Sequence, residues 1–161
     1  MYYAADAPGV GRELRRVALQ NGVSSSALVH DIVPGAGSSS PTGLSPAPFR
    51  NLFGGDVGSL LYFAATTPTT GEELWVTEGL PGTTRMVLDL VPGTAPSWPK
   101  HITQFGAGDY VAFTATSSSR AFVTDGSAAG TREVCGSAVS VSQTHEFTQV
   151  GCDLWLVGSS G

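Results

Sequence analysis

A short block of sequence recurs three times along the chain, and this repeat constrains the fold more than any other feature. The two clearest copies span residues 73–83 and 120–131, and a diverged third copy begins at residues 12–14. Each copy follows an apolar segment. A fourth apolar segment lies near the end of the chain. The equivalent positions of the four apolar segments are Tyr3, Phe63, Phe113 and Leu156, which are separated by 60, 50 and 43 residues. Periods of about 40 to 50 residues are typical of propeller blades built from four short strands.

The second and third copies each predict four short strands. In the segment 110–115, Val111 and Phe113 alternate with Tyr110 and Ala112, so both faces of this strand are largely apolar. Such a strand is expected to be covered on both sides by neighbouring blades. The Asp125-Gly126 pair between two apolar runs indicates a hairpin, because glycine accepts a positive φ without a Cβ clash.

One segment gives conflicting signals. Residues 13–19 contain good helix formers with apolar residues at helical spacing, which alone predict a short helix. The repeat places a strand there, and we follow the repeat. We therefore expect an all-β fold: a propeller-like array of about three four-stranded antiparallel blades, incomplete or part of a larger propeller. The expected units are 1–48, 49–99 and 100–150 of a single domain 1–161, with 151–161 starting a further unit.

The two ends of the chain are expected to be out of phase with whole blades. Met1 stands where the second copy has Leu61, so the chain is expected to begin inside a repeat, as a truncated reading or a fragment would. It also ends on a second strand, residues 154–157. Exposed edge strands at both ends would associate with another copy or with missing blades.

Composition excludes several classes of protein. Charged residues make up 13% of the chain, whereas 41% of residues are hydrophobic and the net charge is only −5, which argues against disorder. Lys100 is the one lysine and the arginines are scattered, so a nucleic-acid surface is not expected. The sequence contains no run of 18 or more apolar residues, so no transmembrane segment is expected. The N-terminus lacks the features of a signal peptide, which is no evidence for a cytoplasmic location.

Cys135 and Cys152 are separated by 17 positions, a spacing that suits neighbouring strands. A disulfide between them would add roughly 3 kcal/mol of stability. The alternative is a pair of unbridged, small apolar side chains. A zinc site is not supported, because no second Cys or His pair stands at ligand spacing.

Three acidic residues are candidates for a functional site. Asp125 could be a calcium ligand, but no further acids stand at alternate positions, and we interpret it as the acceptor that holds its turn. Glu72 and Glu73 are adjacent, so on a strand they point to opposite faces and cannot share one substrate. Glu73 belongs to the repeat and Glu72 is expected to be solvated.

The other candidate residues lack the sequence context of a catalytic or phosphate-binding site. His30, His101 and His145 occupy inequivalent positions in different units, and the serines lack a nucleophile-elbow motif. The Gly-rich segment 54–58 has no following Lys-Ser or Lys-Thr and is expected to be a turn. Trp98, in a proline-flanked loop, is the aromatic side chain best placed to contact a ligand, although packing over an adjacent strand end is the interpretation we favour.

The copies resemble the ELWxxDGT repeat family of large secreted or surface proteins of bacteria, notably myxobacteria. The best matches are residues 73–79 and 124–131, supported by Gly71 and by the similar segments 31–35 and 89–93. The resemblance implies a propeller-like fold and an extracellular or cell-surface location, and no enzymatic activity is generally ascribed to the repeat. Departures from the pattern are Glu78 in place of aspartate, Arg15 in place of tryptophan, and Gly136 in place of the equivalent of Asp89.

These observations favour a non-enzymatic module for recognition or scaffolding, whose loops on one face bind a protein or a glycan. No catalytic residue, metal or cofactor is assigned. The alternative is a carbohydrate-active propeller, such as a glycosidase or lyase, which needs two acids from different units at one loop face. A gene fragment without independent function is the third hypothesis.

Overall fold

The structure is a computed structural model that describes residues 1–50, 56–105, 110–116, 120–134, 147–150 and 153–156. This part of the chain is all-β and contains no helix, which confirms the predicted fold class at that level. Accordingly, none of its elements is a helix long and apolar enough to cross a membrane. The strands are β1 (Tyr2–Ala7), β2 (Gly11–Gln20), β3 (Val23–Leu28), β4 (Thr42–Arg50), β5 (Asp56–Thr67), β6 (Gly71–Thr77), β7 (Arg85–Leu88), β8 (Lys100–Phe105), β9 (Tyr110–Ala115), β10 (Arg120–Thr124), β11 (Arg132–Glu133), β12 (Phe147–Val150) and β13 (Asp153–Leu156).

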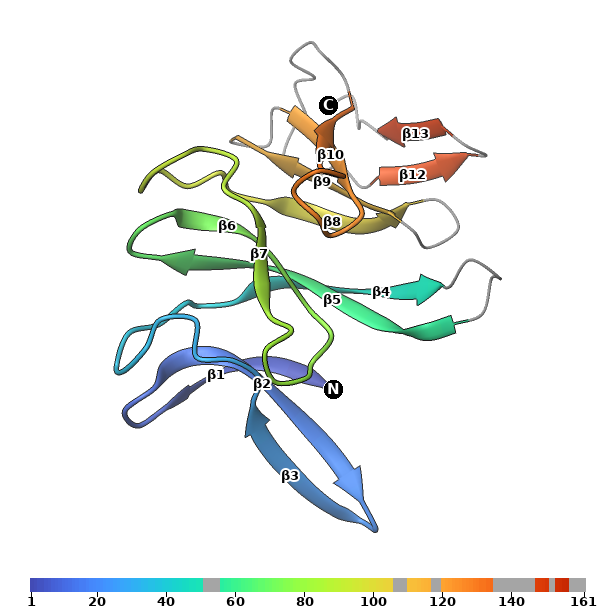
Figure 1. Cartoon of the computed structure of the whole chain (residues 1–161). Helices are drawn as coiled ribbons and strands as arrows, with labels where there is room; N and C mark the ends of the chain where they lie inside the picture. The colour runs from blue at the N-terminus through green and yellow to red at the C-terminus, as the bar shows by residue number, and fades with distance from the viewer. Residues whose placement is uncertain (51–55, 106–109, 117–119, 135–146, 151–152, 157–161) are drawn as a thin grey trace, which may run out of the picture.

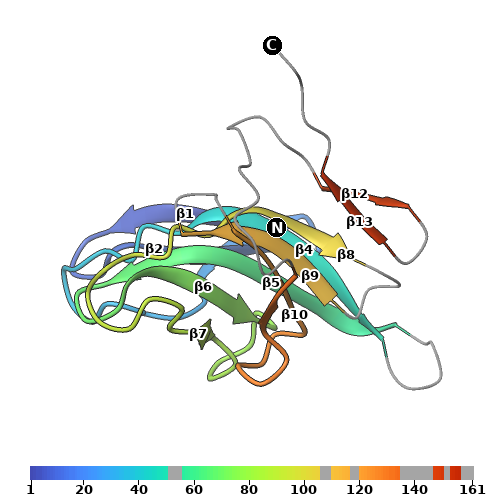
Figure 2. The ribbon, with the colours of Figure 1, turned by 90° about the horizontal axis from the view of Figure 1, so that it is seen from above.

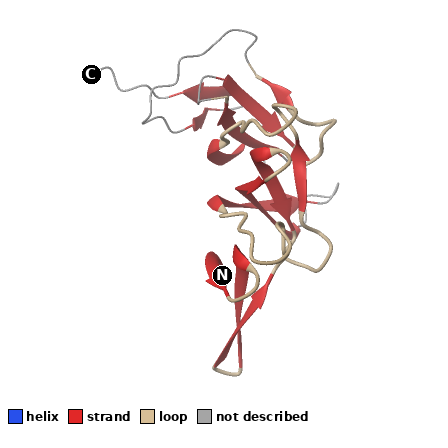
Figure 3. Ribbon diagram, turned by 90° about the vertical axis from the view of Figure 1, so that its left-hand side faces the viewer, coloured by secondary structure: helices blue, strands red, loops and turns tan. Residues whose placement is uncertain are grey.

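The strands form successive antiparallel sheets whose strand order follows the chain. The first sheet contains β1 to β3, the second β4 to β7 and the third β8 to β11, while β12 pairs with β13. These sheets are stacked one above another (Figure 1), and the stack is also visible from the side (Figure 3) and as overlapping layers from above (Figure 2). The four-stranded sheets predicted for the second and third copies of the repeat are thus confirmed. The first sheet has three strands rather than the expected four, because β4, which begins within the expected unit 1–48, pairs with β5 of the second sheet.

The segment with conflicting signals is a strand, as the repeat predicts. β2 pairs with β1 on one side and β3 on the other, so that Arg15 lies opposite both Tyr3 and Leu28. Ladder hydrogen bonds on both edges and packing of Leu14 against the second sheet favour the strand. These interactions outweigh a local helix preference that amounts to less than about 1 kcal/mol per residue.

Apolar side chains fill the space between successive sheets. The rings of Phe113 and Phe122 stack with their centroids 5.5 Å apart, and Phe63 is fully buried, as predicted for side chains packed between units. Trp75 packs against the cluster between the first and second sheets. That cluster comprises Leu14, Val29, Leu61, Phe63 and Ala65. The cluster between the second and third sheets comprises Ala47, Tyr62, Leu74, Val76, Val87, Val111, Phe113, Ala115 and Phe122.

A buried glutamate near the start of β6 holds the loop that leads to the third sheet. The Glu73 carboxylate is fully buried and accepts hydrogen bonds from the Leu90 amide (3.3 Å), the Ser97 amide (3.1 Å) and the Ser97 hydroxyl (2.6 Å). Burial raises the pKa of Glu73, and nearby Asp89 raises it further, against the lowering effect of these hydrogen bonds. We call this arrangement the glutamate–serine clamp.

The first sheet contains the same clamp at the equivalent position. Glu13 in β2 is fully buried and accepts hydrogen bonds from the amides of Ile32 (3.4 Å), Val33 (3.4 Å) and Ser39 (2.9 Å), and from the Ser39 hydroxyl. One side chain therefore accepts hydrogen bonds from four donors of the loop that would otherwise lack an acceptor.

Each clamp also reaches the following sheet. The carbonyl of Ser39 accepts a hydrogen bond from the Thr66 amide of β5 (2.8 Å), and the carbonyl of Ser97 accepts one from the Thr116 amide just after β9 (2.6 Å). The same connection thus recurs at two successive steps of the stack. Each clamp serine is thereby bonded to the equivalent residue of the next sheet, Thr66 or Thr116.

Candidate functional site

The turns after β6 and β10 share one hydrogen-bonding pattern. The buried hydroxyl of Thr77 accepts a hydrogen bond from the Gly79 amide at 3.0 Å, and Thr124 does the same for Gly126, also at 3.0 Å. Both glycines have a positive φ, 77° and 90°. This arrangement directs the intervening residue outward, which is Glu78 in one turn and Asp125 in the other.

Each of these turns is contacted by the preceding sheet. Arg85 on β7 donates a hydrogen bond to the Gly126 carbonyl at 3.1 Å, and Tyr62 lies so close that a Cβ on Gly126 would stand 2.8 Å from its hydroxyl. One sheet earlier, Arg16 donates to the Gly79 carbonyl at 2.9 Å. The turn of one sheet therefore meets an arginine of the sheet before it.

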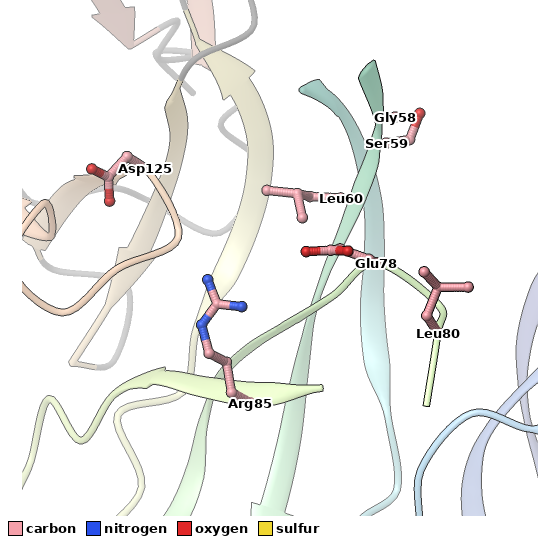
Figure 4. Close-up of a pocket in the computed structure, with 7 residues that line it drawn as sticks. All are labelled: Gly58, Ser59, Leu60, Glu78, Leu80, Arg85 and Asp125. Atoms are coloured by element: carbon pink, nitrogen blue, oxygen red, sulfur yellow. The ribbon is translucent and has the colours of Figure 1, made fainter. Parts of the chain in front are cut away.

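A cavity of about 410 Å³ lies where the second sheet meets the turn of the third. Figure 4 shows the Arg85 guanidinium between the carboxylates of Glu78 and Asp125, with Leu60 and Leu80 nearby. The volume falls within the range of small-molecule sites, about 300–1,000 Å³. The lining residues are Gly58, Ser59, Leu60, Glu78, Leu80, Arg85 and Asp125.

The two carboxylates of the cavity differ in their surroundings. Asp125 accepts hydrogen bonds from the Ser127 amide (2.8 Å) and hydroxyl (2.7 Å), and these bonds, the hydroxyl first, lower the pKa of Asp125. The interpretation of Asp125 as the acceptor that holds its turn is confirmed. Glu78 is exposed, and within the described chain its carboxylate forms no hydrogen bond or ion pair. Glu78 is therefore the acceptor that is available to a ligand.

Tyr62 lies beside this site, beneath the turn that carries Asp125. It is buried, and this burial, together with the negative charge of Asp125, raises the pKa of Tyr62 to about 12, although Arg85 acts in the opposite direction. The hydroxyl therefore stays protonated over the physiological range. It supports Gly126 and its turn.

Trp98, the candidate ligand contact, lies in the loop before β8 with 45% of its surface exposed. It adopts a positive φ of 50° and is not among the residues that line the cavity. The structure thus leaves its indole accessible and apart from Glu78 and Asp125. Its proposed contact with a ligand stays a prediction.

Glu72 and Glu73 are separated as predicted for neighbours on a strand. Glu73 points into the clamp, whereas Glu72 is half-buried rather than fully solvated, and burial raises its pKa while Lys100 lowers it. His101 lies with its Nδ1 2.9 Å from the Thr114 hydroxyl, and His30 is exposed. No group of three or more His, Cys, Asp or Glu side chains in the described ranges could hold a metal ion.

Several predicted residues lie outside the described part of the chain. They are Cys135, Cys152, His145, Gly136, Gly54 and Gly55. The disulfide between Cys135 and Cys152 therefore stays a prediction. The remaining residues of the Gly-rich segment 54–58, residues 56–58, begin strand β5 and do not form the expected turn.

Neither the clamp residues nor Arg85 were predicted from the sequence to be functional. A signal for the clamp exists: Glu13 and Glu73 precede Ser39 and Ser97 by 26 and 24 residues, and similar segments (31–35 and 89–93) stand between them. Arg85 has no such signal, because its role depends on how two sheets are stacked.

Comparisons of the chain with family models, with curated proteins and with solved structures find no match. The resemblance to the ELWxxDGT repeat therefore depends on the motif residues alone.

Proposed function

We propose that this protein is a non-enzymatic recognition module of the bacterial surface or exterior, which binds a protein or glycan in the cavity between its second and third sheets. The observation that carries this proposal is the acid–arginine–acid arrangement of Glu78, Arg85 and Asp125, contributed by two successive sheets. The extracellular location follows from the resemblance to the ELWxxDGT repeat. The same resemblance and the recurrent contacts between sheets support a propeller-like array.

The chemistry of the cavity suits a polar ligand with hydrogen-bond donors. Carboxylates accept paired hydroxyl or amine donors, while a guanidinium donates through a planar fork. Leu60 and Leu80 add apolar surface, against which the carbon face of a sugar or an aliphatic side chain can pack. The cavity therefore fits one or two sugar units, or one polar side chain of a protein partner.

Binding is tested by titrating the chain with oligosaccharides of bacterial surface polysaccharides and with short polar peptides, using calorimetry or NMR. Replacing Glu78 with glutamine is expected to weaken the affinity about tenfold, because a charge-assisted hydrogen bond contributes about 1.5–3 kcal/mol. Arg85→Gln is expected to have a comparable effect. Arg12→Gln is the matched control, since Arg12 forms an exposed ion pair with Asp6 in the first sheet.

The control variant should bind as the unaltered chain does. If no ligand of the panel binds, or if Glu78→Gln and Arg85→Gln leave the affinity unchanged, the cavity is not the recognition site.

A carbohydrate-active enzyme is the second candidate, because Glu78 and Asp125 come from different units and line one cavity. This is the convergence that such an enzyme requires. The lowered pKa of Asp125 suits the ionised carboxylate of such a pair, which leaves Glu78 as the candidate acid. The exposed position of Glu78 weighs against this role, because the acid of a glycosidase is typically held in apolar surroundings. Assays on chromogenic glycosides decide the matter: turnover that is lost in both Glu78→Gln and Asp125→Asn would reverse the ranking.

A further inference from the structure

One edge of β1 presents backbone groups that no described strand pairs with. Met1 and Val17 exchange both backbone hydrogen bonds, with the Met1 amino group donating at 3.3 Å and the Val17 amide at 2.9 Å. Bonded and non-bonded pairs alternate along an antiparallel ladder. The backbone groups of Tyr2, Ala4 and Asp6 therefore point away from β2, which is the single strand paired with β1 in the described sheet.

The equivalent edge of the second sheet is occupied by β4. There Ser45 lies opposite Tyr62 and Thr42 opposite Ala64, while the Ser39 carbonyl accepts the amide of Thr66. Tyr62, Ala64 and Thr66 stand 60 residues after Tyr2, Ala4 and Asp6. The second sheet thus shows how the free groups of β1 can be satisfied.

The third sheet repeats this arrangement. Thr103 of β8 lies opposite Ala112 and Lys100 opposite Thr114, and the Ser97 carbonyl accepts the amide of Thr116. Two independent segments of this chain therefore bind the same type of edge in the same register. Each register contains a bulge, since two residues on one strand (43 and 44, or 101 and 102) oppose one on the other.

The two segments share a sequence pattern that explains this geometry. Residues 39–45 and 97–103 both read Ser-x-Pro-x-x-aliphatic-hydroxyl, with Leu44 or Ile102 as the aliphatic residue. The residue before it adopts a positive φ in both cases, 62° at Gly43 and 51° at His101, which forms the bulge. Leu44 packs against the cluster that contains Leu61 and Phe63, and Ile102 packs against the next cluster.

We propose that the free edge of β1 binds an extended segment of a partner polypeptide with this Ser-x-Pro-x-x-aliphatic-hydroxyl pattern. The serine carbonyl accepts the Asp6 amide, the ladder continues through Ala4 and Tyr2, and the aliphatic side chain covers Met1 and Tyr3. These two residues stand where Leu61 and Phe63 stand in the second sheet, and Met1 has 84% of its surface exposed. This mode of binding adds a strand to a sheet, with main-chain bonds giving affinity and the side-chain pattern giving selectivity.

The test uses the full chain, labelled for NMR, and an unlabelled synthetic peptide with the sequence of residues 97–105. Binding of the peptide should slow hydrogen exchange at the amides of Tyr2, Ala4 and Asp6. It should leave the Tyr3 and Ala5 amides unchanged, since these already bond to β2. If the three edge amides exchange as fast with saturating peptide as without it, the proposal is overturned.

Two alterations test the main-chain hydrogen bonds of the proposed ladder. A peptide with proline in place of Thr103 lacks the amide that faces Tyr2 and is expected to bind about tenfold more weakly. In the protein, Ala4→Pro removes an amide on the free edge, a position where a strand tolerates proline. Unchanged binding of the altered peptide would contradict the proposal even if the protein variant did not fold. Protection of the edge that rises with protein concentration and needs no peptide would show that a second copy is the occupant, and would overturn the assignment of a different partner.

Discussion

Replacing Glu73 with alanine tests whether the glutamate–serine clamp holds the second sheet to the third. The substitution removes the acceptor of two amides, Leu90 and Ser97, and of the Ser97 hydroxyl. The Ser97 amide and hydroxyl keep the Glu72 carbonyl as an acceptor, at 3.0 and 3.3 Å. The Leu90 amide is the donor left without a partner, at a cost of about 1–3 kcal/mol. The truncated side chain also leaves a cavity, whereas releasing a carboxylate from a fully buried site returns part of these costs, so we expect the free energy of unfolding to fall by about 1–3 kcal/mol.

The assay is urea unfolding followed by tryptophan fluorescence, with Glu72→Gln as the control from the adjacent position. The control should change stability by about 0.5 kcal/mol or less. Glu13→Ala should resemble Glu73→Ala, because Glu13 forms the same clamp one sheet earlier. A loss below about 1 kcal/mol in Glu73→Ala, or one equal to the control, would refute the reasoning.

The same carboxylate gives the clamp a pH dependence. Burial raises the pKa of Glu73 above its ordinary value of 4.5, so the folded state holds this proton more tightly than the unfolded state does. The contribution of this group to stability is therefore fully present below pH 4.5 and is lost as the pH rises through the folded-state pKa. Glu73→Gln should flatten the stability profile over that interval, and an unaltered profile would contradict the shift.

Three further predictions follow from the turn of the third sheet. Gly126→Ala should lower the free energy of unfolding by about 1–3 kcal/mol in thermal melts, since its φ is 90° and the methyl group would meet the Tyr62 hydroxyl. Because the pKa of Tyr62 is raised to about 12, stability should fall between pH 10 and pH 12, and less steeply in Tyr62→Phe; identical alkaline unfolding curves would argue against this. Because hydrogen bonding to Ser127 lowers the pKa of Asp125 below its ordinary 3.8, stability is present above that value and lost as the pH falls through the folded-state pKa. Ser127→Ala should reduce this acid loss, as measured by acid unfolding, and an equal loss in both proteins would count against it.

The strands and turns could be predicted from the sequence because their signals are local or repeated. Alternation of apolar residues predicted β9, and Asp125-Gly126 predicted the hairpin turn that follows β10. The comparison of repeats was decisive for β2, where local helix propensity alone would have given the wrong answer. Helix propensity depends only on the residues of the segment itself. The repeat instead relates the segment to strands that are paired on both edges, as β2 is.

The clamp and the cavity could not be predicted in the same way. Glu73 and Ser97 are 24 residues apart, and their contact depends on the path of the connecting loop. Glu78 and Asp125 approach one cavity because two sheets are stacked, and no spacing in the sequence encodes that stacking. The paired observation that Glu13 and Ser39 recur as Glu73 and Ser97 is the one signal that would have indicated the clamp.

The residue after each clamp serine has a consequence for how such repeats diversify. Ser40 and Trp98 are held in the left-handed conformation at φ of 48° and 50°, and both side chains are exposed. The anchoring comes from the preceding serine and the following proline, so the identity of the residue between them is free to drift. An exchange as drastic as hydroxymethyl for indole leaves the scaffold intact, and each layer thereby offers a site where surface chemistry can be varied without remodelling the backbone.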